Sequence, residues 1–237
     1  MTKVEVSFKH LPTTAISDAT GGHTNLRSDI KPLADHFKIA GRAVTVRLPD
    51  GENRAVLEAI RAANEGDILV IDAKGNTNRA VAGDFILSLA KGIGVQGLVV
   101  DGVIRDIAGI RELNFPVFSL GTTVAAGNKN GGGKVNVPIA IGGVTVHPGD
   151  YVIGDVDGVV VVPQEDAERI AAAAETKLAK DERRVQEAHA NGKESISAYL
   201  DKVLTSQLDN RASASLAKAA GLTLFGKREV ISPDSND

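Results

Sequence analysis

The chain has 237 residues and a formal net charge of −3, with 43% hydrophobic and 24% charged residues. Its length suits one large domain or a domain with an appendage, and its composition is that of an ordinary globular protein. The weak negative charge and the lack of a basic block argue against binding to nucleic acid. Two Tyr, six Phe and no Trp argue against a base-stacking platform.

Cysteine is absent, which excludes disulfides, thiolate metal sites and cysteine nucleophiles. The start of the chain, MTKVEVSFKHLPTT, has no apolar core of signal-peptide length. No apolar run approaches the ~20 residues that are needed to span a bilayer. We therefore expect a cytoplasmic protein that does not bind a membrane.

Predicted strands and helices alternate up to Gly121. Their spacing predicts helices over 12–20, 52–64, 79–94 and 107–113, and strands over 38–48, 67–73, 97–100 and 116–121. This alternation is typical of parallel βαβ units. After Gly121 the pattern changes, and Val-rich segments with Pro-Gly-Asp and Asp-Gly turns over 142–163 predict an antiparallel meander.

Two further helices are predicted near the C-terminal end, from Gln164 to about Ala190 and over 193–219. Their composition is too polar for a separate core. We therefore expect an α/β body over residues 1–165 and a C-terminal helical arm over 166–237 that packs on the body or on another subunit.

Charged residues fall at the ends of the predicted strands. Asp72 and Asp101 each close a strand, Asp84 begins the helix between them, and the pair Arg105-Asp106 follows Asp101 closely. The carboxyl ends of parallel strands form the ligand crevice of such sheets. We therefore expect Asp84, Arg105 and Asp106 at one edge of the sheet.

These residue types support a specific chemistry. One Asp with several waters is a common way to hold Mg²⁺, and an adjacent Arg stabilises negative charge on a substrate oxygen. A second carboxylate positions a water for proton transfer. Gly83 would let a ligand approach the backbone, and the N–H groups of Phe85 and Ile86 would hold a carboxylate or phosphate. The set suits a 2-oxo acid that passes through an enolate.

A purely structural interpretation stays open at this point. Asp106 is well placed as the N-cap of the helix over 107–113, and Arg105 has Asp101 within reach as an ion-pair partner.

Twenty residues separate Asp84 from the pair Arg105-Asp106. This D-x20-R-D spacing resembles the motif of the class II 4-hydroxy-4-methyl-2-oxoglutarate/4-carboxy-4-hydroxy-2-oxoadipate aldolases, which share a fold family with the regulator of ribonuclease activity A (RraA). The surrounding sequence is similar too, in the segments ISDATGG (16–22), GVQGLVVDGVIRD (94–106), FPVFSLG (115–121) and VNVPIAIGGVTVHPGDYVIGDVDGVVVVP (135–163). The resemblance covers about residues 10 to 190.

The resemblance implies an RraA-like α-β-β-α sandwich that assembles as a homotrimer or homohexamer. Asp106 would ligate Mg²⁺ or Mn²⁺, and Arg105 would contact the pyruvyl oxygens. Asp84 would hold the water that exchanges a proton with the pyruvate methyl group. The N–H groups of Phe85 and Ile86 would take the pyruvyl carboxylate. Some members of the family also decarboxylate oxaloacetate.

The sequence departs from the family in places. The text after Gly83 reads Asp84-Phe85-Ile86 instead of the usual Glu-Leu-Leu, and no proline follows Gly121 closely. The C-terminal arm also differs. In the aldolases a glutamate of a neighbouring subunit's arm helps to hold metal-bound water, and the candidates here are Glu182, Glu187 and Glu194.

Other polar residues have ordinary structural interpretations. His147 flanks a turn, and His23 lies in a predicted loop. The segment NKNGGGK over 128–134 lacks the spacing of a phosphate-binding loop and is interpreted as a mobile loop near the site. Asp155 and Asp157 are typical of hairpin turns.

We therefore predict a metal-dependent lyase that acts on a small 2-oxo acid. The alternative is a protein-binding regulator similar to the ribonuclease E inhibitor of the same fold. A methyltransferase is disfavoured because no G-x-G-x-G loop follows the first strand.

Overall fold

The structure, a computed structural model, describes residues 6–205. The chain divides into two compact units, and the boundary along the sequence falls between Ala179 and Lys180. Within the described part of the chain, no helix combines the length and the apolar character that crossing a membrane requires.

The first unit is built on an eight-stranded sheet with the order β1-β6-β4-β3-β2-β11-β12, and β8 also pairs with β2. The strands are β1 (Lys31–Pro32), β2 (Ile39–Arg47), β3 (Ile68–Asp72), β4 (Gly97–Val100), β6 (Val117–Ser119), β8 (Lys134–Val135), β11 (Tyr151–Asp155) and β12 (Gly158–Val162). Strands β2, β3, β4 and β6 are parallel neighbours, whereas β11 and β12 extend the sheet in antiparallel register. The βαβ expectation is therefore confirmed for the parallel half of the sheet.

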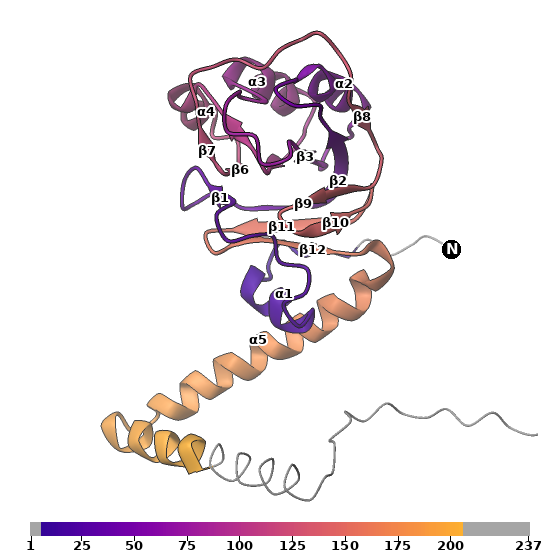
Figure 1. Ribbon diagram of the computed structural model, residues 1–237. Helices are drawn as coiled ribbons and strands as arrows, with labels where there is room; N and C mark the ends of the chain where they lie inside the picture. Colours follow the sequence, from indigo (N-terminus) through magenta and orange to yellow (C-terminus); the bar gives the residue numbers. More distant parts are fainter. Residues whose placement is uncertain (1–5, 206–237) are drawn as a thin grey trace, which may run out of the picture. The chain divides into compact units, whose positions relative to one another are not determined.

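Three helices cover one face of the parallel strands (Figure 1). They are α2 (Arg54–Ala62), α3 (Asp84–Gly92) and α4 (Ile107–Leu113). Each central strand is buried on both sides, so alternate residues such as Leu69 and Ile71 pack under these helices. Ile68 and Val70 point into a second core on the opposite face.

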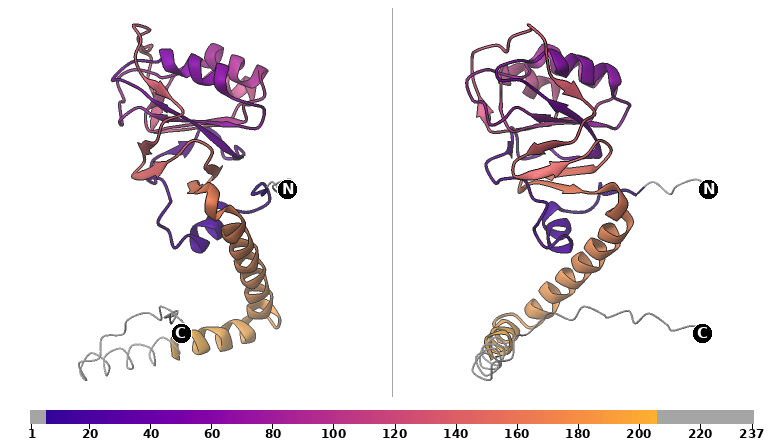
Figure 2. Two further views of the ribbon diagram at one scale, coloured as in Figure 1. Left: turned by 90° about the vertical axis from the view of Figure 1, so that its right-hand side faces the viewer. Right: turned by 45° about the vertical axis from the view of Figure 1, so that its right-hand side comes forward.

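The second core is closed by the meander that follows Gly121. Hairpin strands β9 (Ile139–Ile141) and β10 (Val144–Val146) contribute to it, as do β11 and β12. Beyond these strands lie α1 (Thr13–Ala19) and the beginning of α5 (Ala167–His189), joined by a third core around Ile16 and Ile170. Both turned views keep α2 and α3 on one side of the strands and α1 on the other (Figure 2). The predicted α-β-β-α sandwich is confirmed.

The helix predicted over 79–94 begins only at Asp84. The reason is that residues 80–82 are extended and pair with β5 (Val103–Ile104), a two-residue strand that the sequence pattern did not reveal. On its other side β5 pairs in parallel with β7 (Gly121–Thr122). By contrast, the predicted strand 97–100 and helix 107–113 have the observed bounds.

The second unit contains the end of α5 and a helix over 193–205. The Ser195 hydroxyl joins the two, because it donates to the Ala188 carbonyl and accepts the Asn191 N–H at 3.0 Å. Glu182, Glu187 and Glu194 all lie in this unit. The remainder of the helix predicted over 193–219 lies outside the described residues.

Candidate active site at the carboxyl edge of the sheet

Backbone pairing beyond the main sheet brings the motif residues together. The Val81 N–H donates to the Val103 carbonyl at 3.0 Å, and the Arg105 N–H donates to the Ala82 carbonyl at 3.1 Å. Two segments that are far apart in sequence therefore run side by side toward α3 and α4. As a result Gly83-Asp84 comes to lie beside Arg105-Asp106, as the sequence predicts.

Each of the two carboxylates lies against a glycine of the other segment. A methyl group built on Gly83 would come well inside 3.0 Å of Asp106 Oδ2, and one built on Gly109 would come equally close to Asp84 Oδ2. Real Cβ atoms essentially never approach another atom within 3.0 Å. The two glycines therefore leave the space in which the carboxylates sit.

Asp106 has an unusual backbone. It precedes α4 with φ 59° and ψ 45°, the left-handed region, which residues other than glycine rarely adopt. Its side chain makes no capping hydrogen bond to α4. Asp106 therefore occupies the N-cap position, but the interpretation of its carboxylate as a helix cap is wrong. Strained backbone of this kind is concentrated at functional sites.

Arg105 pairs with its sequence neighbour. Its Nε lies 3.1 Å from Asp106 Oδ2, and the side chains are 41% and 39% exposed, respectively. Asp101 is not its partner, because the Asp101 carboxylate accepts the Ala73 N–H at 2.7 Å. Within residues 6–205 the two terminal nitrogens of the Arg105 guanidinium make no hydrogen bond to protein, so they are open to a ligand.

The start of α3 supplies backbone donors. The first N–H groups of a helix have no carbonyl within the helix to which to donate. The Phe85 N–H, however, donates to Asp84 Oδ1 at 2.6 Å. The expectation that this N–H is free for a ligand therefore needs correction, since a bound carboxylate must first displace Asp84 Oδ1. Ile86 lies at the same helix end and remains a candidate donor.

A surface hollow of about 430 Å³ adjoins Asp84 between α3 and α4. It is lined by Asp84, Phe85, Ser88, Gly109, Glu112 and Leu113. The Phe85 ring is 71% exposed beside it. Among the described residues, a small ligand that reaches Asp84 on this side meets Phe85 and Leu113 together with the polar groups of Ser88 and Glu112, and no basic side chain.

Asp101 is a buried carboxylate with a structural role. It is 8% exposed, and its Oδ1 fixes the loop after β3 through the Ala73 N–H. Burial raises the pKa of Asp101 to about 6, with the negative charge of Asp72 as a further cause. Asp72 and Asp101 close neighbouring strands, as predicted, but their carboxylates accept the backbone N–H groups of Lys74 and Ala73, and within residues 6–205 neither pairs with Arg105.

The donor set at Asp106 fits a hard divalent cation that keeps much of its water. Asp106 offers one partly exposed carboxylate. Within residues 6–205 no group of three or more His, Asp and Glu side chains converges on one point. One carboxylate with several waters suits Mg²⁺ or Mn²⁺, whereas Zn²⁺ takes three or four protein ligands.

The other polar residues singled out in the sequence have structural partners. The Asp155 carboxylate accepts the N–H and hydroxyl of Thr13, and His147 is exposed beside Asp150. His23 is exposed in the loop after α1. The segment 128–134 is tied down by a buried glutamate, Glu52, which accepts the Asn130 side-chain amide and the Gly131 N–H.

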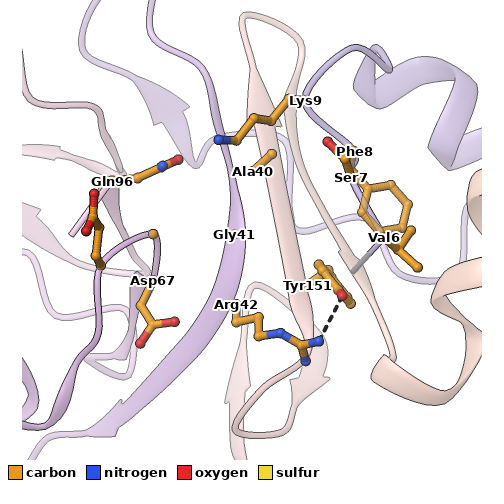
Figure 3. A pocket seen from close by; sticks show the side chains of 12 residues that line it. Val6, Ser7, Phe8, Lys9, Ala40, Gly41, Arg42, Asp67, Gln96 and Tyr151 are labelled. Atoms are coloured by element: carbon orange, nitrogen blue, oxygen red, sulfur yellow. Dashed lines mark hydrogen bonds between the residues drawn. The ribbon is translucent and has the colours of Figure 1, made fainter. Parts of the chain in front are cut away.

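A second hollow lies at the opposite, amino edge of the parallel strands (Figure 3). It has a volume of about 260 Å³. It is lined by the start of β2 and by residues that directly precede β3 and β4. Its Arg42 guanidinium donates to the Tyr151 hydroxyl at 2.9 Å and to Gln164 Oε1 at 2.6 Å, and Asp67 Oδ2 accepts the Asn64 N–H. Arg42 and Asp67 therefore have protein partners, although Lys9 and Glu65 also line this hollow. The carboxyl edge is the candidate active site because Asp84, Arg105 and Asp106 converge there.

The fold and this edge define an α/β protein with two carboxylates and an arginine at the carboxyl ends of parallel strands. The RraA-like family, Aldolase/RraA, matches residues 13–161, and the chain belongs to this family. The resemblance seen in the sequence is thereby confirmed.

Individual relatives carry more than one description. A Halalkalibacterium halodurans protein named "Putative 4-hydroxy-4-methyl-2-oxoglutarate aldolase" is 50% identical over 197 residues, which are 83% of this chain and 93% of the relative. A crystal structure of an uncharacterized Pseudomonas syringae protein has a TM-score of 0.69 and 30% identity, covering 81% of this chain and 94% of that one. The RNA-processing inhibitor RraA from Thermus thermophilus has a TM-score of 0.60 and 30% identity, covering 64% of this chain and 92% of that one.

Two parts of the site were not anticipated. They are Gly109 and the pairing of residues 80–82 with β5. Gly109 carried a usable signal, because glycine is costly inside a helix and stands three residues after Asp106. The pairing carried none, since two-residue strands have no period to recognise.

Proposed function

We propose that the protein is a divalent-metal-dependent lyase that cleaves a 4-hydroxy-2-oxo acid, such as 4-hydroxy-4-methyl-2-oxoglutarate, and releases pyruvate. The observation that carries the proposal is the convergence of Asp84, Arg105 and Asp106, with Asp106 in a strained conformation that capping does not explain. The name of the Halalkalibacterium relative supports the same activity.

Cleavage breaks the bond between C3 and C4 of such a substrate. The C4 hydroxyl passes its proton to the water that Asp84 would hold and becomes a carbonyl, while the electron pair of the bond passes into an enolate of pyruvate. The terminal nitrogens of Arg105 would bind the 2-oxo and carboxylate oxygens and stabilise the charge that develops there. The Ile86 N–H, and the Phe85 N–H once it is released from Asp84, would hold the carboxylate.

Protonation of the enolate carbon completes the reaction. Asp84 would hold the water that delivers this proton, because its carboxylate lies at the helix start beside the proposed pyruvyl position. Asp106 would hold Mg²⁺ or Mn²⁺, which acts as a Lewis acid on the 2-oxo group when bound. Decarboxylation of oxaloacetate would use the same residues, since it also gives pyruvate enolate.

The first experiment measures pyruvate release from 4-hydroxy-4-methyl-2-oxoglutarate and from oxaloacetate. Metal-stripped protein is assayed with and without added Mg²⁺ or Mn²⁺. Turnover of either compound that depends on the metal supports the proposal. No turnover of either, together with no binding of Mn²⁺, contradicts it.

A second candidate function is that of a protein-binding regulator. It is favoured by the structural match to a protein described as an RNA-processing inhibitor. Under this proposal the chain would bind a ribonuclease of the E type and would turn over neither compound. Inhibition of such a ribonuclease by the purified protein, unaffected by Asp106→Asn, would support the regulator and place its surface away from the motif.

A further inference from the structure

Gly109 is the third residue of α4, where glycine is a poorer helix former than alanine. The helix runs over Ile107–Leu113, and a glycine inside a helix costs about 0.5–1 kcal/mol relative to alanine. Its backbone is helical, so no positive φ explains the choice of residue. What lies above it is Asp84, whose Oδ2, Cβ and Cγ are the three atoms nearest to a built Cβ.

Gly83 shows the same relation in the opposite direction. Its φ of −134° and ψ of −176° are extended backbone that any residue adopts, so conformation does not require glycine here. The space beside it is taken by Asp106 Oδ2, with Arg105 Cγ 3.2 Å from a built Cβ. Gly83 was expected to let a ligand approach, but the atom that approaches it is a carboxylate oxygen of the protein.

We infer that Gly83 and Gly109 are positioning residues. Each of them leaves the space that a carboxylate of the other segment occupies. Asp84, at the start of α3, lies on Gly109 of α4, and Asp106, before α4, lies on Gly83 before α3. The site motif thus extends to Gly-Asp-x20-Arg-Asp-x2-Gly. The inference rests on the proposed function for the roles of the two carboxylates. It adds that Gly83 positions the proposed metal ligand Asp106 and that Gly109 positions Asp84, which would hold the water for proton transfer.

The reciprocal arrangement predicts that two alanine substitutions have different effects. In Gly83→Ala the new methyl group pushes aside Asp106, so binding of Mn²⁺ alone should weaken at least tenfold. In Gly109→Ala it pushes aside Asp84, so Mn²⁺ affinity should stay within about twofold. In Gly109→Ala, the exchange of the pyruvate methyl protons with D₂O, followed by NMR, should slow at least tenfold. In Gly83→Ala the displaced atom is the end of the Asp106 side chain, whereas in Gly109→Ala the Asp84 Cβ also lies within 3.0 Å of the new methyl group, so α3 and α4 must shift slightly there.

Thermal stability separates positioning from packing. Gly109→Ala gains helix propensity, which offsets the strain of moving Asp84 Cβ and Cγ, so its melting temperature should stay close to that of the parent protein while proton exchange falls. Gly92→Ala is the matched control, because Gly92 ends α3 and a built Cβ there meets no atom within 4 Å. It should leave Mn²⁺ affinity and proton exchange unchanged.

A double variant shows whether Gly109 acts through Asp84. The Asp84→Asn substitution alone removes the part of the proton exchange that depends on the Asp84 carboxylate. Adding Gly109→Ala should then lower it by less than twofold. Full additivity of the two substitutions would show that Gly109 acts by another route and would overturn the inference.

Crystal structures of the two alanine variants test the seating without any activity. Displacement of Asp106 in Gly83→Ala and of Asp84 in Gly109→Ala is the expected result. Carboxylates that stay in place would overturn the inference even if activity falls. Failure of the parent protein to bind Mn²⁺ and to exchange protons would overturn the proposed function instead, and the crystal structures would still decide the positioning role.

Discussion

The two edges of the same parallel sheet use charged residues in opposite ways. At the amino edge, Arg42 donates to the Tyr151 hydroxyl (Figure 3). It also donates to Gln164 and to the Gly149 carbonyl, and its guanidinium lies 4.6 Å from the Tyr151 ring centroid. At the carboxyl edge, Arg105 contacts Asp106 through Nε, and within residues 6–205 its terminal nitrogens have no protein partner.

The difference extends to the backbone. Asp106 holds a left-handed conformation without using its side chain as a cap, and glycines leave room for two carboxylates. A charged group with several protein partners, such as Arg42, contributes to stability, whereas strained backbone beside a guanidinium with one partner suits the binding of a ligand. Substitutions at the two edges should therefore affect different measurements.

The largest effect is expected for Asp106→Asn. Asparagine tolerates the left-handed backbone at least as well as aspartate and has nearly the same size, so the fold should be unchanged. Loss of the only charged metal ligand proposed should lower metal-dependent turnover by about 1,000-fold. The measurement is the kcat for pyruvate release at saturating Mn²⁺, with circular dichroism as the control. Turnover near that of the parent protein would show that the metal binds elsewhere.

Arg105→Lys should have the next largest effect. An ammonium group carries the charge but cannot form two parallel hydrogen bonds to a carboxylate or 2-oxo group. We expect kcat/KM to fall by about 100-fold, with most of the loss in kcat because the charge develops in the transition state. A change confined to KM would instead assign Arg105 to binding of the ground state.

Sequence reasoning predicted this edge better than it predicted the way the edge is built. Apolar runs with clear ends gave the strand over 97–100 and the helix over 107–113, and the chain positions of Asp84, Arg105 and Asp106 followed from them. The start of α3 was misplaced because residues 80–82 pair with β5, a contact that depends on distant residues. Local patterns carry no information about such pairing.

The same limit applies to the side chains of the site. That the Phe85 N–H is engaged by Asp84, or that Gly109 lies under Asp84, depends on the packing of two helix starts. Spacing in the sequence brings residues to an edge, but only packing decides which atoms meet. The metal and the proton-exchange role of Asp84 remain predictions that the experiments above address.

Asp101→Asn tests whether the buried carboxylate of Asp101, at the carboxyl edge, affects the stability of the fold. Its pKa in the folded protein, about 6, exceeds the ~3.9 of an unfolded chain, so the folded state binds the extra proton between these values. The stability that this proton contributes is present below pH 4 and is lost as the pH rises through 6. Asparagine keeps an acceptor for the Ala73 N–H and carries no charge.

The difference in unfolding free energy between Asp101→Asn and the parent protein should therefore change by about 2–3 kcal/mol in favour of the variant when the pH rises from 4 to 7. Urea unfolding of both proteins at the two pH values measures this difference. Turnover at pH 7 should change by less than twofold, because within residues 6–205 Asp101 does not pair with Arg105. An equal difference at both pH values would show that the carboxylate of Asp101 does not titrate in this range.

Arg42→Leu is the reciprocal test at the amino edge and should have the smallest effect. It removes the hydrogen bonds to Tyr151, Gln164 and the Gly149 carbonyl while keeping an apolar stem over the ring. We expect a loss of about 1–2 kcal/mol in unfolding free energy, since partly exposed hydrogen bonds contribute about 1 kcal/mol each and leucine restores some packing. The kcat and KM for pyruvate release should stay within twofold, because the sheet separates this edge from Asp106. A loss of turnover at full stability would mean that the amino edge takes part in catalysis, and the contrast between the two edges would then fail.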